Sequence, residues 1–249
     1  MIPLFKSHYS IGKSILNLSN ASEDGGSDSI ISIAQANDIS NLVLVEDSLG
    51  GFLEAYKACE NASLNLIFGL RIKCSDESGV ENQKDHHKII IFPRTKDGVQ
   101  LLSELYSESF VNNSGMINMS FLNKKWSDKH LKMFIPFYDS FIHYNVLSFN
   151  SFVPDLSFTS PTFFIEDNGL PFDFSLKSKV ESYCSSSGLK TERAKSIFYK
   201  NKSDFNSFVT YKLICGRKNF PGSGSSLEKP NLDHLGSDKF CWESFCQQS

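Results

Sequence analysis

Short apolar segments with a strand-like pattern alternate with helix-like segments along this chain, and this alternation restricts the fold more than any other feature. The pattern predicts strands at 1–5, 41–45, 64–72, 87–92, 131–137, 161–166 and 193–199. It predicts helices at 29–38, 51–60, 95–110, 174–185, 203–215 and 237–246. A strand followed by a helix, repeated along the chain, indicates an α/β fold with a parallel sheet or barrel. Residues 111–160 have the weakest periodicity.

Length and composition predict a single globular domain. The chain has 249 residues, of which 40% are hydrophobic and 21% charged, so it can bury a substantial core. Neither an internal repeat nor a low-complexity linker interrupts it. The net charge of −3 provides no overall basic stripe, so contact with DNA is expected only locally or through a partner.

The cysteines and the apolar runs indicate the cellular compartment. The six cysteines contain no CxxC pair, so the spacing of a zinc ribbon is absent. The apolar start at 1–5 is too short for a signal peptide, which predicts reduced thiols in a cytoplasm, mostly as core fillers. No apolar run approaches the roughly 20 residues that span a bilayer, so no membrane contact is expected.

Five segments, in order, resemble the PHP domain that opens the alpha subunit of bacterial DNA polymerase III, a C-family replicative polymerase. They are SLGGFLEAYKACENASLNLIFGLRIKC (48–74), HKIIIFPRTKDGVQLLSEL (87–105), IEDNGLP (165–171), YKNKSDFNSFVTYKLIC (199–215) and PNLDHLGSDKFCWESF (230–245). These segments cover most of the chain and leave 111–160 unmatched.

The resemblance implies a fold and a location for a site. The expected fold is a distorted (β/α)7 barrel over residues 1–216, with a loop and short helix at 217–249 leading toward a polymerase palm. Active members of the family bind a cluster of metals at the C-terminal ends of the strands. Such metals generate hydroxide and hold the phosphate of a phosphoester.

The resemblance also implies that this metal site is vestigial. The family's ligand positions fall on Ile2, Leu4, Lys6, Lys13, Val45, Glu46, Arg71, His87 and Phe198. Isoleucine and leucine have no donor atoms, and a lysine ammonium repels a cation. His87 alone matches a family ligand, and one ligand cannot hold a metal cluster. No catalytic residue, metal or cofactor is therefore expected.

Two further expectations concern the old ligand positions. Lys6 and Arg71, if both point inward, would fill the site through a salt bridge to Glu46 or Asp47. The family's cysteine ligand falls within 134–139, with Tyr138 or Phe137 as the expected occupant.

Three other patterns have a plainer structural interpretation. PDLSF (154–158) has one Asp where two-metal phosphoryl transfer needs two or three. FPGSGSS (220–226) lacks the lysine of a phosphate-binding P-loop. His8, between Ser7 and Ser10, has no evident orienting carboxylate for a nucleophile–base pair.

The leading functional expectation is a catalytically inactive scaffold of a C-family replicative DNA polymerase. By resemblance, its partners would be the polymerase palm or catalytic subunit and a proofreading exonuclease, with DNA contacted indirectly. The composition fits a split subunit encoded by a phage, which would work in the host cytoplasm, with the palm on another polypeptide. One alternative is a metal-dependent phosphoesterase with a rearranged site of His8, Glu46, Asp47, His86 and His87. Another is a stand-alone interaction protein.

Overall fold

Seven strands close into a barrel in the computed structural model, which describes residues 1–19, 26–75, 87–149, 151–216 and 236–248. The strands are β1 (Ile2–Phe5), β2 (Asn41–Glu46), β3 (Asn65–Ser75), β4 (His87–Pro93), β6 (Leu131–Ile135), β7 (Thr162–Ile165) and β8 (Lys190–Ile197). Their order is β2-β1-β8-β7-β6-β4-β3, and the pairing of β2 with β3 closes the ring. A short strand, β5 (Met116–Asn118), lies outside the ring and pairs in parallel with the end of β3. The predicted α/β class is thus confirmed, as a single domain with a closed barrel.

Strand β4 departs from the predicted parallel arrangement. It runs antiparallel to β3, with Leu70 opposite Ile91, and antiparallel to β6, with Phe134 opposite Ile90. The other pairs within the ring are parallel. β3 and β4 follow one another in the element order and pair directly, which suits an antiparallel pair, whereas a parallel pair needs a longer crossover. The start of β4 therefore lies at the same end of the barrel as the C-terminal ends of its neighbours.

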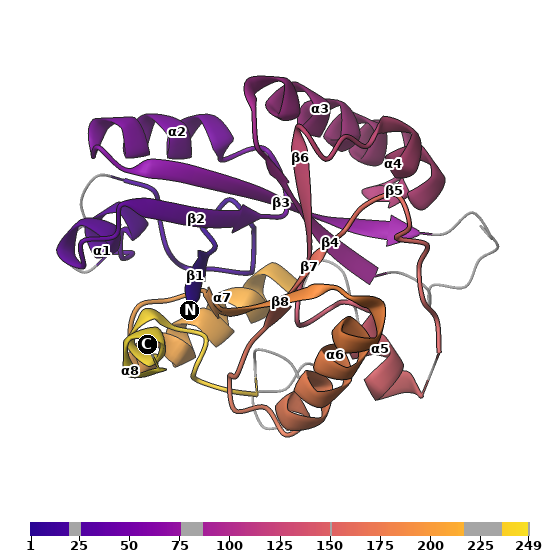
Figure 1. Cartoon of the computed structure of the whole chain (residues 1–249). Helices are drawn as coiled ribbons and strands as arrows, with labels where there is room; N and C mark the ends of the chain where they lie inside the picture. The colour runs from indigo at the N-terminus through magenta and orange to yellow at the C-terminus, as the bar shows by residue number, and fades with distance from the viewer. Residues whose placement is uncertain (20–25, 76–86, 150, 217–235, 249) are drawn as a thin grey trace.

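Helices surround the strands on the outside of the barrel (Figure 1). Those in the described residues are α1 (Ile30–Ala36), α2 (Phe52–Asn61), α3 (Lys96–Ser107), α4 (Met119–Lys125), α5 (Phe141–Ser148), α6 (Asp173–Ser187), α7 (Phe205–Gly216) and α8 (Trp242–Gln248). Side chains fix several starts: Ser29 caps α1 and Thr95 caps α3, each accepting a hydrogen bond from a backbone N–H of the first turn. None of the described helices is long and apolar enough to cross a membrane.

Several element boundaries differ from the sequence prediction. The helix expected at 95–110 ends at Ser107 and continues as a π-helical turn over Glu108–Asn112. The helix expected at 237–246 begins only at Trp242. Residues 111–160, where periodicity was weakest, contain β5, α4, β6 and α5. These elements are short, and so they leave little periodic signal.

Successive side chains of a strand point to opposite faces, so the barrel has one apolar core inside the ring of strands and another between the strands and the helices. Side chains that point into the barrel form a small cluster of Leu4, Val43, Val45, Ile90, Phe92, Phe164 and Ala194. Their strand neighbours point outward and pack under the helices in a larger cluster, as Phe5 does next to Leu4. Inside the barrel, the ring of Phe134 stacks on Phe164 at 4.7 Å and meets Phe92 edge-on at 5.2 Å. These rings fill the interior below its mouth.

The C-terminal segment packs directly on the barrel. Trp242, at the start of α8, stacks on Phe5 of β1 at 5.6 Å. Just before it, Phe240 stacks on Phe198, which follows β8, at 5.5 Å. The loop expected at 217–235, which includes FPGSGSS, lies outside the described residues. The described end of the expected tail is therefore joined to the barrel core rather than separate from it.

Candidate functional site

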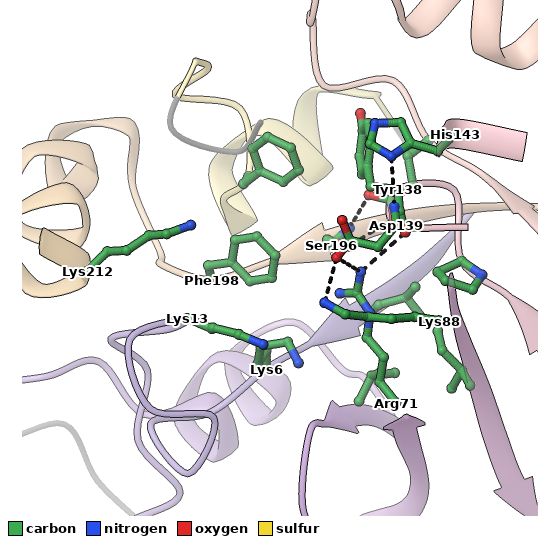
Figure 2. Close-up of a pocket in the computed structure, with 16 residues that line it drawn as sticks. Lys6, Lys13, Arg71, Lys88, Tyr138, Asp139, His143, Ser196, Phe198 and Lys212 are labelled. Atoms are coloured by element: carbon green, nitrogen blue, oxygen red, sulfur yellow. Dashed lines mark hydrogen bonds and ion pairs between the residues drawn. The ribbon is translucent and has the colours of Figure 1, made fainter. Parts of the chain in front are cut away.

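A pocket of about 270 Å³ lies at the mouth of the barrel, above the aromatic filling. It is lined by Leu4, Lys6, Lys13, Val45, Arg71, Lys88, Ile90, Pro136, Tyr138, Asp139, His143, Glu166, Ser196, Phe198, Lys212 and Phe240. Most of these residues lie at or just beyond strand ends, where backbones of different strands come together. Figure 2 shows the charged side chains among them converging from several elements.

Strand periodicity explains why charged side chains line the pocket. In β1, Leu4 faces the barrel interior, and Lys6 follows two residues later. In β4, Ile90 faces the interior, and Lys88 precedes it by two. Because alternate residues of a strand share a face, the lysines extend the apolar inner face into the pocket.

The first ion cluster joins β1 to the end of β2. Lys6, only 3% exposed, has its Nζ 3.3 Å from Asp47 Oδ1, and Lys13 Nζ lies 2.6 Å from Asp47 Oδ2. Burial alone would raise the pKa of the Asp47 carboxyl, but the charges of Lys6 and Lys13 outweigh it and hold that pKa well below its usual range. Burial also lowers the pKa of Lys6, against the attraction of Asp47. Asp47 thus stays ionised and neutralises part of the local positive charge.

The second ion cluster is centred on Asp139. Its Oδ2 lies 2.9 Å from Arg71 Nη2 and 2.7 Å from Lys88 Nζ. Burial would raise the pKa of Asp139, but the two cations lower it well below its usual range. Burial and the nearby Arg71 charge lower the pKa of Lys88 to about 8. This cluster ties β3 and β4 to the loop after β6.

His143 and the backbone hold Asp139 in place. Asp139 has a left-handed backbone (φ 62°), a region that Asp tolerates better than most residues. The backbone N–H of Asp139 donates to His143 Nδ1 at 3.1 Å, and its carbonyl accepts from the Lys88 N–H at 2.8 Å. Burial lowers the pKa of His143. A neutral imidazole is therefore favoured, with Nδ1 as the acceptor.

Two buried glutamates serve as hydrogen-bond acceptors beside the pocket. Glu46 is fully buried and accepts from the Ser7 backbone N–H at 2.7 Å and from the Ser10 hydroxyl. Glu166 accepts from the Ser196 N–H at 2.8 Å and from Ser196 Oγ at 2.9 Å. Burial raises the pKa of both carboxyls. Their hydrogen bonds fix the loop after β1 and tie β8 to the end of β7.

The structure brings together most of the positions that the resemblance marks as former ligand positions. Leu4, Lys6, Lys13, Val45, Arg71 and Phe198 all line the one pocket. Ile2 packs deeper, against the cluster inside the barrel. Glu46 lies next to the pocket rather than in its lining.

Of the two expected inward salt bridges, the one of Lys6 forms with an expected partner and the one of Arg71 does not. Lys6 pairs with Asp47, one of its two expected partners, while Glu46 binds Ser7 and Ser10 instead. Arg71 pairs with Asp139, which lies in the segment that the sequence left unmatched. Asp139 follows β6 and lies over the barrel mouth beside β3 and β4, so it is within ion-pair distance of Arg71.

His87 does not point into the pocket. The next residue of β4, Lys88, lines the pocket, so alternation turns His87 toward the outer core. There its ring lies 6.2 Å from that of Phe141 and 5.7 Å from that of Phe152. His87, which alone matches a ligand of the family that the sequence resembles, is thus directed away from the pocket.

The described residues of the alternative phosphoesterase site do not come together. Glu46 ends β2 and Asp47 follows it at the barrel mouth, but His8 is exposed and His87 faces the outer core. His86 lies outside the described residues. Within the described part of the chain, no group of three or more histidine, cysteine, aspartate or glutamate side chains could hold a metal ion.

Several residues of the pocket were missed from the sequence. Asp139 and His143 lie in 111–160, where neither periodicity nor resemblance gave a firm alignment. Of the two occupants expected for the family's cysteine position, Tyr138 lines the pocket and Phe137 is buried in the outer core. Lys88 could have been found from alternation, because it shares a face with Ile90. Glu166 could also have been found, because a charged residue directly after the apolar run 163–165 is expected at a strand end.

Comparison with models of known protein families finds no match to this chain, and comparison with curated proteins finds none either.

Proposed function

We propose that this chain is a degenerate PHP-type (β/α)7 barrel that acts as a non-catalytic scaffold of a C-family replicative DNA polymerase. One observation carries the proposal: six of the nine residues that the resemblance marks as ligand positions line a single pocket at the barrel mouth. Ion pairs of lysine and arginine with aspartate occupy that pocket. Positive side chains repel a divalent cation, so they favour a structural role for the site over a catalytic one.

The ion pairs suit a scaffold because they connect strands that are distant in sequence. Asp47 connects the end of β2 to Lys6, and Asp139 connects β3 and β4 to the loop after β6. Removing one partner of a buried ion pair typically costs about 3–5 kcal/mol. In this proposal, the ion pairs hold the barrel mouth in the shape that metals hold in the active relatives.

The proposed partners follow from the resemblance. They are the polymerase palm subunit and a proofreading exonuclease, with DNA reached through them, in the cytoplasm of a bacterium or phage-infected host. The described C-terminal segment 236–248, packed on β1 and β8, would lie at the junction with the palm.

Co-purification tests the scaffold proposal. The tagged chain is used to capture proteins from cells that express the polymerase catalytic subunit and exonuclease of the same genome. The expected result is recovery of one of the two in stoichiometric amount. Trp242→Ala, which removes the stacking on Phe5, serves as a variant, and the exposed Lys57→Ala serves as its control. Recovery of neither protein would overturn the scaffold assignment.

Metal analysis tests the degenerate site separately. Purified protein, treated briefly with a chelator and then incubated with zinc or manganese, should hold neither ion in stoichiometric amount. One equivalent of tightly bound zinc or manganese, lost on His87→Ala, would refute the proposal and favour a phosphoesterase.

A further inference from the structure

Lys195 is buried on the outer side of the barrel, where the C-terminal helix α8 reaches it. Its neighbour Ala194 faces the barrel interior, so alternation along β8 directs Lys195 outward. The Lys195 side chain has no exposed surface. Its Nζ lies 3.1 Å from the backbone carbonyl of Asp167, 2.9 Å from Oδ1 of Asn168 and 3.1 Å from Oε1 of Gln248. Because none of these three acceptors is charged, burial favours the neutral amine over the ammonium.

Glu166 lies on the other side of the same amide. Its Oε2 accepts a hydrogen bond from Nδ2 of Asn168 at 3.0 Å. Asn168 is fully buried and Glu166 nearly so. The amide of Asn168 therefore lies between an amine, which contacts its oxygen, and a carboxyl group, which contacts its nitrogen.

The environment shifts the ionisation of both flanking groups toward the uncharged form. Burial lowers the pKa of Lys195, against the attraction of the Glu166 charge. Burial also raises the pKa of Glu166, against its hydrogen bonds with Ser196 and Asn168. A neutral amine is a nucleophile, and a protonated carboxyl group can donate a proton to a leaving group.

We propose that Lys195 and Asn168 form a covalent amide bond between their side chains, with Glu166 as the acid–base catalyst. The carbonyl carbon of Asn168 is bonded to Oδ1 at about 1.2 Å. Since Nζ is 2.9 Å from Oδ1, it is at most about 4.1 Å from that carbon. Reacting atoms are typically about 3–3.5 Å apart, so a small rotation of either side chain brings the two atoms to that distance.

The atoms and protons of this step balance without a further reactant. The neutral amine of Lys195 attacks Cγ of Asn168 and forms the new C–N bond. Protonated Glu166 gives its proton to Nδ2, and the bond between Cγ and Nδ2 breaks to release ammonia. The attacking nitrogen then returns a proton to the Glu166 carboxylate, which restores the catalyst. Burial of the three side chains keeps water, the competing nucleophile, away from the amide.

The bond would join two segments of the folded barrel. Asn168 lies in the loop after β7 and Lys195 in β8, 27 positions further along the chain. The two side chains meet only after these segments have packed together, so the reaction follows folding. The bond would then hold this side of the barrel closed. This inference goes beyond the proposed scaffold role and does not depend on it.

Peptide mass spectrometry of the purified full chain tests the bond. Trypsin cleaves after lysine and arginine, so it releases 133–177, which contains Asn168, and cleaves after an unmodified Lys195. A lysine whose side chain is an amide is not cleaved. The expected result is therefore a branched peptide that joins 133–177 to 194–200. Its mass should be that of these two peptides together, less one ammonia.

Three variants identify the reacting groups. Lys195→Arg and Asn168→Ala each remove one partner of the bond and should abolish the branched peptide. Glu166→Gln keeps the shape of the side chain but not its proton transfer, so most of the chain should stay unlinked. Lys57→Arg, on the outer helix α2, is the control and should form the branched peptide as fully as the unaltered chain.

The unaltered chain decides the proposal even where a variant fails to fold. Absence of the branched peptide from the folded, unaltered chain would overturn it. Loss of ammonia without a branched peptide would overturn it too, because the Asn168 amide would then have reacted with the backbone nitrogen of Gly169. An undiminished branched peptide in Glu166→Gln would reject Glu166 as the catalyst. These outcomes leave the scaffold assignment untouched, because that assignment depends on protein partners.

Discussion

The ammonium of Lys6 lies 3.3 Å from the carboxylate of Asp47, and the lysine side chain is only 3% exposed. Lys6 follows β1 and Asp47 follows β2, so the pair joins two neighbouring strand ends at the barrel mouth. A lysine buried this deeply needs a partner, because an uncompensated charge in a protein interior is costly.

Asp47→Ala is expected to destabilise the protein by about 3–5 kcal/mol, because it leaves Lys6 buried without its ion-pair partner. Urea unfolding followed by circular dichroism measures the change. The double variant Lys6→Met/Asp47→Ala should recover part of the loss, because it removes the unpaired charge. Lys13→Ala, at a more exposed position, is the control and should cost at most about 1 kcal/mol. A double variant no more stable than Asp47→Ala would contradict this explanation.

Acid should destabilise the barrel through Asp47 and Asp139. Both carboxyls have a folded-state pKa below the ordinary value of 3.8, so their contribution to stability is complete above that value. It is lost as the pH falls further toward the folded-state pKa. The free energy of unfolding, measured with urea at several values between about pH 2.5 and 6, should show this fall. In Asp139→Asn, the free energy of unfolding should fall less steeply with decreasing pH. If its dependence on pH were unchanged, Asp139 would be excluded as a contributor.

Glu166 should act in the opposite direction. Burial raises its pKa above the ordinary value of 4.5, so the folded state takes up a proton before the unfolded chain does. Its contribution therefore makes the fold more stable as the pH falls from neutral toward that value. Glu166→Gln keeps the shape of the side chain and should remove this rise. The rise would be measured from the midpoint of urea unfolding, and its persistence in Glu166→Gln would assign it to another group, such as Glu46.

Gly69→Ala should disturb the aromatic filling of the barrel. A Cβ at this position would lie 2.6 Å from a ring atom of Phe92, so the ring must move. Overpacking of this kind typically costs about 1–3 kcal/mol, measurable by thermal or urea unfolding. Phe92→Leu in the same chain should offset part of the cost. Gly50→Ala, where the added Cβ meets its nearest atom at 3.4 Å, is the matched control.

The sequence by itself determined the α/β class, most of the strands and helices, and the strand ends at which the polar residues gather. These follow from local periodicity, which each segment carries on its own. The resemblance located Lys6, Lys13 and Arg71, which the structure places in one pocket. Residues 111–160 gave little signal, because their elements are short and irregular.

Only the tertiary structure decided which charged residues meet. The reversed direction of β4 brings Lys88 to the mouth and directs His87 to the outer core. The loop after β6 supplies Asp139 as the partner of Arg71, and Asp47 rather than Glu46 pairs with Lys6. Ion pairs depend on distances between residues far apart in the chain, and those distances exist only once the barrel has closed. Local patterns contain no information on them.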